Sequence, residues 1–303
     1  MHPWIPWLVF HLFLLCALAL DLGLFHRRSE VVSFRQSLGW SGVWAFLALG
    51  FGAGMYHFSG PEAGLAFFAG YLLEWSLSVD NLFVFISVFS FFAVPAALQH
   101  RVLFWGVLGA LVMRAVCVFA GVALLDQFHW ILWVFGVFLV GTGIKLAIGE
   151  SVPKDPREHF LVRQITRWFP FTSVYHEDHF WVRENGRRVG TPLLLALVVI
   201  EATDLLFAMD SIPAVLGIST DPFIVYTSNV FAILGLRSLY FALAGLISFF
   251  QFLRFGLAGI LVFIGCKLCL APWISVSTGV SLLVVFSCLV LSILASLFAK
   301  GRQ

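Results

Sequence analysis

Charged residues are scarce in this chain: Lys, Arg, Asp and Glu make up 11% of its 303 residues. A soluble domain carries about a quarter charged residues. Apolar residues account for 61% of the chain, and the mean hydropathy is +0.98. Because so few polar groups cannot cover that much apolar surface in water, the composition excludes an ordinary soluble domain and predicts that lipid surrounds most of the chain.

Cysteine is also rare, and the usual hydrolase motifs are missing. The five cysteines all lie in apolar stretches, so no disulfide framework is expected: Cys16, Cys117, Cys266, Cys269 and Cys288. The sequence contains no Gly-x-Gly-Asp, Gly-x-Ser-x-Gly or His-Glu-x-x-His motif. We therefore predict that the protein is not an intramembrane hydrolase or another enzyme, and that it needs no resident cofactor.

Nine apolar stretches are long enough to cross a bilayer, which needs about 20 helical residues. They are residues 4–25, 40–58, 63–91, 100–125, 129–149, 191–217, 223–249, 255–271 and 275–298. The first lacks a basic leader and ends in Arg27 and Arg28, so it is expected to be an anchor, not a cleaved signal. The predicted fold class is an all-α polytopic membrane protein with nine transmembrane helices.

The basic residues predict the orientation of these helices. With the N-terminus outside and the C-terminus inside, 14 of the 18 Lys and Arg lie in inner segments and none in outer segments. The inner segments are 26–39, 92–101, 150–190, 250–254 and 299–303. The longest, 150–190, is predicted to form a β-hairpin over residues 180–190 that turns at Asn185-Gly186. His176-Glu177-Asp178-His179 in that segment could bind a metal, although a solvated turn is favoured because consecutive residues rarely converge on one ion.

Three pairs of similar segments predict an internal repeat. Val79-Asp80-Asn81 resembles Met209-Asp210-Ser211, Leu111–Arg114 resembles Leu234–Arg237, and Gly143-Ile144-Lys145 resembles Gly265-Cys266-Lys267. Each copy has three helices, an odd number, so the second copy begins on the opposite side of the membrane. We predict an inverted repeat, the usual plan of a secondary transporter with its site near the midplane. The chain would then consist of two N-terminal helices (1–62), the first repeat (63–149), an inner loop (150–190), the second repeat (191–271) and a final helix with a short tail (272–303).

The predicted helices carry nine charged residues. The acids are Glu74, Asp80, Glu201, Asp204 and Asp210, and the bases are Arg114, Lys145, Arg237 and Lys267. Each costs roughly 2.5–3.5 kcal/mol at mid-bilayer, so the residues must pair, face water or bind ions. One interpretation is a scaffold of ion pairs. Only the two arginines lie at mid-depth among the acids, however, and the remaining negative charge favours a site for a divalent cation or protons.

Helical geometry and residue type refine this site. Glu74, Ser78 and Asn81 share a helix face, whereas Pro213 removes a hydrogen bond to Met209 and predicts a helix break over 210–213. The candidate ligands are all oxygen donors: Glu74, Asp80, Asn81, Glu201, Asp204, Asp210, Ser211 and Asn229, with the Thr203 hydroxyl and backbone carbonyls. Such ligands suit Mg²⁺, Ca²⁺ and Mn²⁺ without separating them.

Three long motifs resemble those of the TerC/Alx family of membrane proteins. They are Glu74–Asn81, Glu201–Ala214 and Thr227–Arg237, and the likeness extends to Asp21, Pro95–Leu98 and Thr220–Phe223. The resemblance implies a bacterial inner-membrane exporter of Mn²⁺, with protons as the simplest counter-ion. The partners would be the lipid bilayer, the metal ion and protons, with no nucleic acid and with a homo-oligomer left open. The alternative is a membrane scaffold that delivers metal to exported enzymes, or one that confers tellurite resistance.

Overall fold

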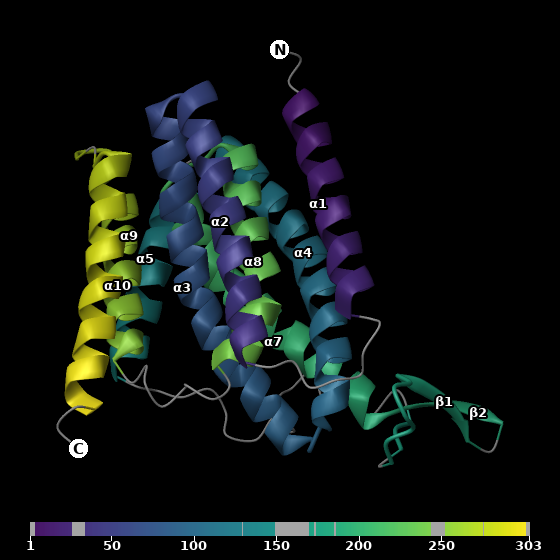
Figure 1. Cartoon of the computed structure of the whole chain (residues 1–303). Coiled ribbons are helices and arrows are strands. Elements are labelled where there is room, and N and C mark those ends of the chain that lie inside the picture. Colours follow the sequence, from purple (N-terminus) through teal and green to yellow (C-terminus); the bar gives the residue numbers. More distant parts are fainter. Residues whose placement is uncertain are drawn as a thin grey trace.

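The protein is a bundle of long helices with a small hairpin at one end (Figure 1). The computed structural model describes residues 4–25, 34–128, 130–148, 170–172, 174–184, 186–243, 252–274 and 276–300. Across these ranges the helices are α1 Ile5–Phe25, α2 Phe34–Phe58, α3 Pro61–Phe91, α4 Ala96–Gln127, α5 Ile131–Ile148, α7 Pro192–Leu216, α8 Pro222–Leu243, α9 Leu253–Leu270 and α10 Thr278–Lys300. Each overlaps one predicted span.

Large apolar side chains cover the outside of the bundle. Phe46 is 74% exposed, Phe58 87% and Leu15 63%. In the described part of the chain, six helices are long and apolar enough to cross a membrane: α2, α4, α5, α7, α9 and α10. Shorter apolar stretches occupy Ile5–Ala19 in α1 and Pro222–Leu236 in α8. The chain is therefore an all-α polytopic membrane protein, and a total of nine spans stays a prediction.

Helices from the two predicted repeats are interleaved. α3 and α4 each pack against α7 and α8, and α5 packs along α9. α1 and α2 cover α8, where Phe10 of α1 contacts the rings of Phe223, Tyr226 and Phe231. Charged residues on α3, α4 and α7 are therefore brought to one interface between the repeats.

The α5–α9 contact has the symmetry expected of an inverted repeat. A Cβ added at Gly143 would lie 2.9 Å from the Ala258 carbonyl oxygen, and one added at Gly265 would lie 2.6 Å from the Gly136 carbonyl oxygen. The contacts are reciprocal, because Gly143 corresponds to Gly265 and Gly136 to Ala258 in the repeat. Only glycine permits this close antiparallel approach of two backbones.

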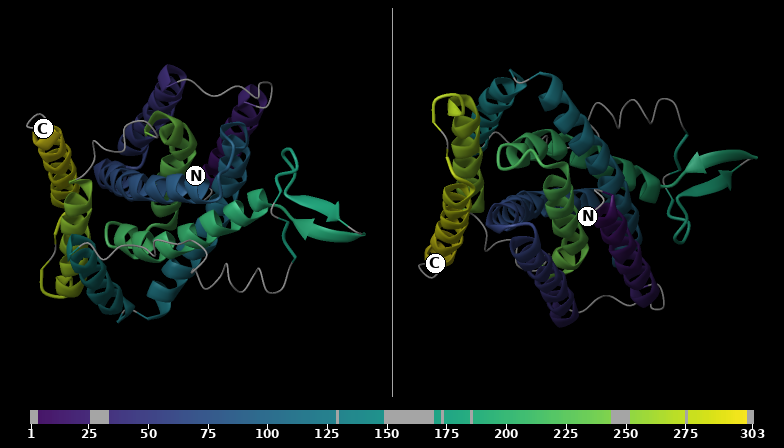
Figure 2. Two further views of the ribbon diagram at one scale, coloured as in Figure 1. Left: turned by 90° about the horizontal axis from the view of Figure 1, so that it is seen from below. Right: turned by 90° about the horizontal axis from the view of Figure 1, so that it is seen from above.

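The predicted hairpin is present outside the bundle (Figure 2). β1 Trp181–Glu184 pairs antiparallel with β2 Arg187–Gly190, with Trp181 opposite Gly190. Gly186 has a φ of 76°, which the turn requires and glycine adopts without strain; Asn185 lies outside the described residues. The hairpin and the end of α10 lie at one end of the bundle, and the start of α1 lies at the other (Figure 1).

The predicted break in the sixth span is wrong. α7 runs as one helix from Pro192 to Leu216 with Pro213 inside it. Proline removes one backbone hydrogen bond, but residues Ser211–Leu216 are all buried, and their packing holds the helix in place. The Asp210 carboxylate is therefore not redirected by an unwound segment.

Candidate cation site around Arg114

A buried arginine joins four helices, α3, α4, α7 and α8. Arg114 on α4 is 3% exposed, and its Nη1 donates to the Glu74 carboxylate on α3. The same nitrogen lies 3.3 Å from Ser211 Oγ on α7 and 3.5 Å from Asn229 Oδ1 on α8. Its Nη2 donates to Asp204 Oδ1 on α7 at 3.3 Å. A single guanidinium thus holds oxygens from both repeats.

Two amides complete this cluster. Asn229 Nδ2 donates to Glu74 Oε1 at 2.8 Å, and Asn81 Nδ2 on α3 donates to Asp204 Oδ1 at 3.3 Å. We define the Arg114 cluster as Glu74, Asn81, Arg114, Asp204, Ser211 and Asn229. All six residues are at most 3% exposed. With two carboxylates and one guanidinium, the cluster carries a formal charge of −1 when its acids are ionised.

Three oxygens in or beside the cluster have no hydrogen-bond partner within the described residues. They are Asn81 Oδ1, Asp204 Oδ2 and the hydroxyl of Ser78, which precedes Asn81 by one helical turn. Leaving a buried polar atom unsatisfied costs about 1–3 kcal/mol, and more for a charged one. Buried oxygens of this kind ordinarily meet water, a proton or a cation. The side of the cluster formed by Ser78 and Asn81 is therefore able to accept positive charge.

The cluster contains residues at equivalent positions of the predicted repeat. Glu74 and Asp204 are 130 residues apart along the chain, as are Asn81 and Ser211. An inverted repeat brings such positions together near its axis. The predicted repeat would therefore account for the contact of Glu74 and Asp204 with one guanidinium.

Other predicted site residues lie elsewhere. Asp210 accepts a hydrogen bond from Thr142 of α5 at 3.2 Å and interacts electrostatically with Lys145. Glu201 is half-buried and lies against Gly109 of α4, where a Cβ would collide with its carboxylate. Thr203 Oγ1 donates to the Val199 and Ile200 carbonyls of its own helix, so it is not directed at the cluster.

Three further charged residues, Lys267, Asp80 and Arg237, were predicted to belong to the site. Lys267 Nζ donates to Ser281 Oγ of α10 at 2.9 Å, away from the carboxylates. The side chains of Asp80 and Arg237 lie outside the described residues. Thr142 was not predicted as a site residue, and its only signal in the sequence is a hydroxyl directly before Gly143, which packs against α9. Sequence reasoning placed Ser78 on the Glu74 face without assigning it a role.

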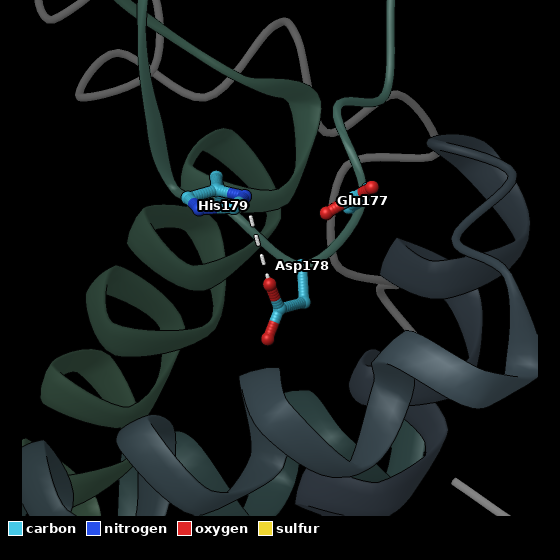
Figure 3. Close-up of side chains that lie close together, drawn as sticks. All are labelled: Glu177, Asp178 and His179. Carbon is cyan, nitrogen blue, oxygen red and sulfur yellow. Dashed lines mark ion pairs between the residues drawn. The ribbon is translucent and has the colours of Figure 1, made fainter.

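The loop that precedes α7 holds a second group of carboxylate and imidazole side chains. Glu177, Asp178 and His179 place one possible ligand atom each within 4.8 Å of one another (Figure 3). Asp178 is already paired with Arg101 of α4, and His179 Nδ1 lies 3.6 Å from Asp178 Oδ1. His176 pairs with Glu184 of the hairpin at 3.3 Å. These contacts leave the side chains partly exposed, as in the predicted solvated turn.

The same loop is tied to the membrane helices. Tyr175 donates its hydroxyl to the Phe92 carbonyl at 2.7 Å, and partial burial raises the pKa of Tyr175. Arg101 lies over the Phe180 ring at 5.3 Å. Ala93, with a φ of 51°, lies in the tight turn between α3 and α4 that presents the Phe92 carbonyl. The loop and the start of α4 therefore form one structural unit.

Comparisons with known proteins identify relatives along nearly the whole chain. An uncharacterized membrane protein of Myxococcus xanthus, STKORF319, is 52% identical over 297 residues, which cover 98% of this chain and 93% of that protein. A protein of Escherichia coli K12, provisionally named membrane-bound redox modulator Alx, is 45% identical over 296 residues and covers 94% of this chain and 92% of its own length. An uncharacterized membrane protein of Rickettsia bellii is 39% identical over 295 residues, covering 97% of this chain and 98% of its own length.

No solved structure matches the chain. The model of the integral membrane protein TerC family matches residues 59–303. This range contains all the residues of the Arg114 cluster and both predicted repeats. Together with the relatives, the match shows that the chain belongs to the integral membrane protein TerC family.

Proposed function

We propose that the protein exports a divalent metal cation, with Mn²⁺ as its first candidate substrate, across the bacterial inner membrane in exchange for protons. In the proposed orientation the N-terminus is outside, and the hairpin and C-terminus are cytoplasmic. The observation that carries the proposal is the Arg114 cluster. It is a fully buried, oxygen-lined group with a formal charge of −1 when its acids are ionised, located where α3 and α4 pack against α7 and α8.

The donor set supports a hard divalent cation. Carboxylate, amide and hydroxyl oxygens suit Mn²⁺, Mg²⁺ and Ca²⁺, and no cysteine or histidine belongs to the cluster. Two oxygens of the cluster, on Asn81 and Asp204, and the neighbouring Ser78 hydroxyl lack a hydrogen-bond partner among the described residues. The cluster alone does not distinguish these metals; Mn²⁺ is preferred because of the family motifs in residues 74–81, 201–214 and 227–237.

The proposed mechanism is alternating access. The two repeats would rock against each other and expose the cluster first to the cytoplasm and then to the outside. Moving a cation outward against an inside-negative potential costs about 2.3 kcal/mol per charge for each 100 mV. Export therefore needs a driving ion, and carboxylates that lose the metal outside can take up protons there.

Inverted membrane vesicles test this proposal. Their interior corresponds to the cell exterior, so export appears as uptake of radiolabelled Mn²⁺, and an acid interior should accelerate it. A protonophore should remove the acceleration. Uptake that ignores the pH gradient but follows another ion gradient would disprove proton exchange alone, whereas no metal uptake under any gradient would disprove export.

Redox modulation, the role in the name of the Alx relatives, is a second candidate. The feature of this chain that favours it is the Cys266-x-x-Cys269 spacing on α9, where the Cys269 thiol also lies 4.0 Å from the Trp133 carbonyl. Both thiols are free. The double substitution C266S/C269S should leave Mn²⁺ uptake unchanged if the protein is an exporter, and should abolish its cellular effect if thiol chemistry is its function.

A further inference from the structure

The guanidinium of Arg114 occupies the oxygens that a transported cation would need. Its two terminal nitrogens contact Glu74, Asp204, Ser211 and Asn229, which are four of the eight oxygen ligands predicted from the sequence. A planar guanidinium suits this arrangement because it presents several donors in a rigid fork. The chain itself thus already supplies one of the two positive charges that would balance the ionised carboxylates.

A divalent cation and this guanidinium compete for the two carboxylates. The cluster carries −1 with Arg114 in place, so an added divalent ion would leave a net charge of +1 in a buried site. Two cations within a few ångströms of each other repel strongly where the effective dielectric constant is low. Binding of the ion therefore requires the guanidinium to move away from at least one carboxylate.

The unpartnered oxygens indicate where the ion would enter. Asp204 uses Oδ1 for both Arg114 and Asn81, and its Oδ2 has no partner among the described residues. Asn81 Oδ1 and Ser78 Oγ, both on α3, are likewise buried without a described partner. These oxygens can contact an ion before the guanidinium leaves.

We propose that Arg114 is a tethered substitute for the transported cation, which occupies the site in the ion-free protein and is displaced by an ion arriving from the Ser78–Asn81 side. The inference rests on the proposed function and adds a competition within the same site. It has two consequences. Arg114 weakens metal binding enough to allow release, and it balances one of the two carboxylate charges while the metal-free transporter returns.

Metal binding to the purified protein in lipid nanodiscs tests the competition. By titration calorimetry with Mn²⁺, Arg114→Gln should bind the ion about tenfold or more tightly than wild type, because a competing charge is removed. Turnover in vesicles should fall in the same variant. Ser78→Ala should weaken binding. The control is Arg101→Gln, which also removes an arginine paired with a carboxylate, but at the loop surface, and should leave the Kd unchanged.

Chemical rescue separates competition from general damage. In Arg114→Ala, added guanidinium ion at a non-denaturing concentration should return the Mn²⁺ affinity toward the wild-type value, whereas NaCl of equal ionic strength should not. If these variants fail to fold, Arg114→Lys keeps the charge but cannot span the four oxygens, and should bind Mn²⁺ more tightly than wild type.

The outcomes distinguish the two proposals. Weaker Mn²⁺ binding in a folded Arg114 variant, or no competition by guanidinium, would overturn the inference while leaving export intact. If wild-type vesicles do not transport Mn²⁺, the proposed function fails regardless of the binding data.

Discussion

Arg114 and Arg101 both lie on α4 and both pair with acids from distant parts of the chain, but their surroundings differ. Arg114 and Glu74 are 3% and 0% exposed at their side chains, whereas Arg101 and Asp178 are 31% and 50% exposed. Breaking a buried pair typically costs 3–5 kcal/mol, and breaking a surface pair about 0–1 kcal/mol. The same type of contact is thus expected to be essential in the bundle and nearly dispensable in the loop.

The largest effect is expected from Asp204→Asn. The substitution removes one carboxylate charge at nearly constant volume, so the helices should still assemble, while Mn²⁺ export should fall by about a hundredfold or more, corresponding to about 2.7 kcal/mol. The export rate is measured as uptake of radiolabelled Mn²⁺ into inverted vesicles, normalised to the amount of membrane-inserted protein. Export at the wild-type rate would show that the Arg114 cluster is a scaffold.

Asp210→Asn should have a smaller effect. Asp210 is held by Thr142 outside the Arg114 cluster, so the equilibrium affinity for Mn²⁺ should stay within about twofold of wild type, a change of about 0.4 kcal/mol, while the export rate falls. Binding by calorimetry and rate by vesicle uptake separate the two quantities. A loss of affinity as large as that of Asp204→Asn would place Asp210 among the metal ligands after all.

Gly109→Ala tests whether packing, independently of charge, positions the acids. Its new Cβ would collide with the Glu201 carboxylate, the far end of a flexible side chain, so the carboxylate should turn away at a cost below the roughly 1–3 kcal/mol of overpacking against rigid neighbours. We expect a modest loss of export with little change in the thermal unfolding midpoint in detergent. Gly54→Ala on α2, where an added Cβ meets no atom within 4 Å, is the control and should leave both export and the midpoint unchanged.

The smallest effect is expected from Asp178→Asn in the loop. The pair with Arg101 is partly exposed and screened by salt, so its loss should change the free energy of unfolding by about 0–1 kcal/mol. Export at saturating Mn²⁺ should be unchanged. A large loss of export would mean that the contact between the loop and α4 controls access to the site, and the contrast between the two arginines would then disappear.

The charge pattern of the sequence predicted the grouping of these buried polar residues better than its local geometry predicted the shape of α7. Glu74, Asn81, Asp204, Ser211 and Asn229 were expected near one another, and the fold places them around Arg114. Buried charge in a membrane must be satisfied, so the residue types themselves predict that partners exist. Pro213 was misleading, because helix packing overrode the local loss of one hydrogen bond.

The sequence alone determined that this is an all-α membrane protein with a hairpin in its longest loop. Hydropathy, turn residues and repeated motifs are local or periodic signals, and they can be recognised without contacts between distant segments. Tertiary structure decided which acids contact the Arg114 guanidinium. Glu74 and Asp204 are neighbours only because α3 and α4 pack between α7 and α8, and Asp210 is excluded because an unbroken α7 directs it toward Thr142 on α5. Such choices depend on the rotation and depth of each helix, which are set by packing over the whole bundle.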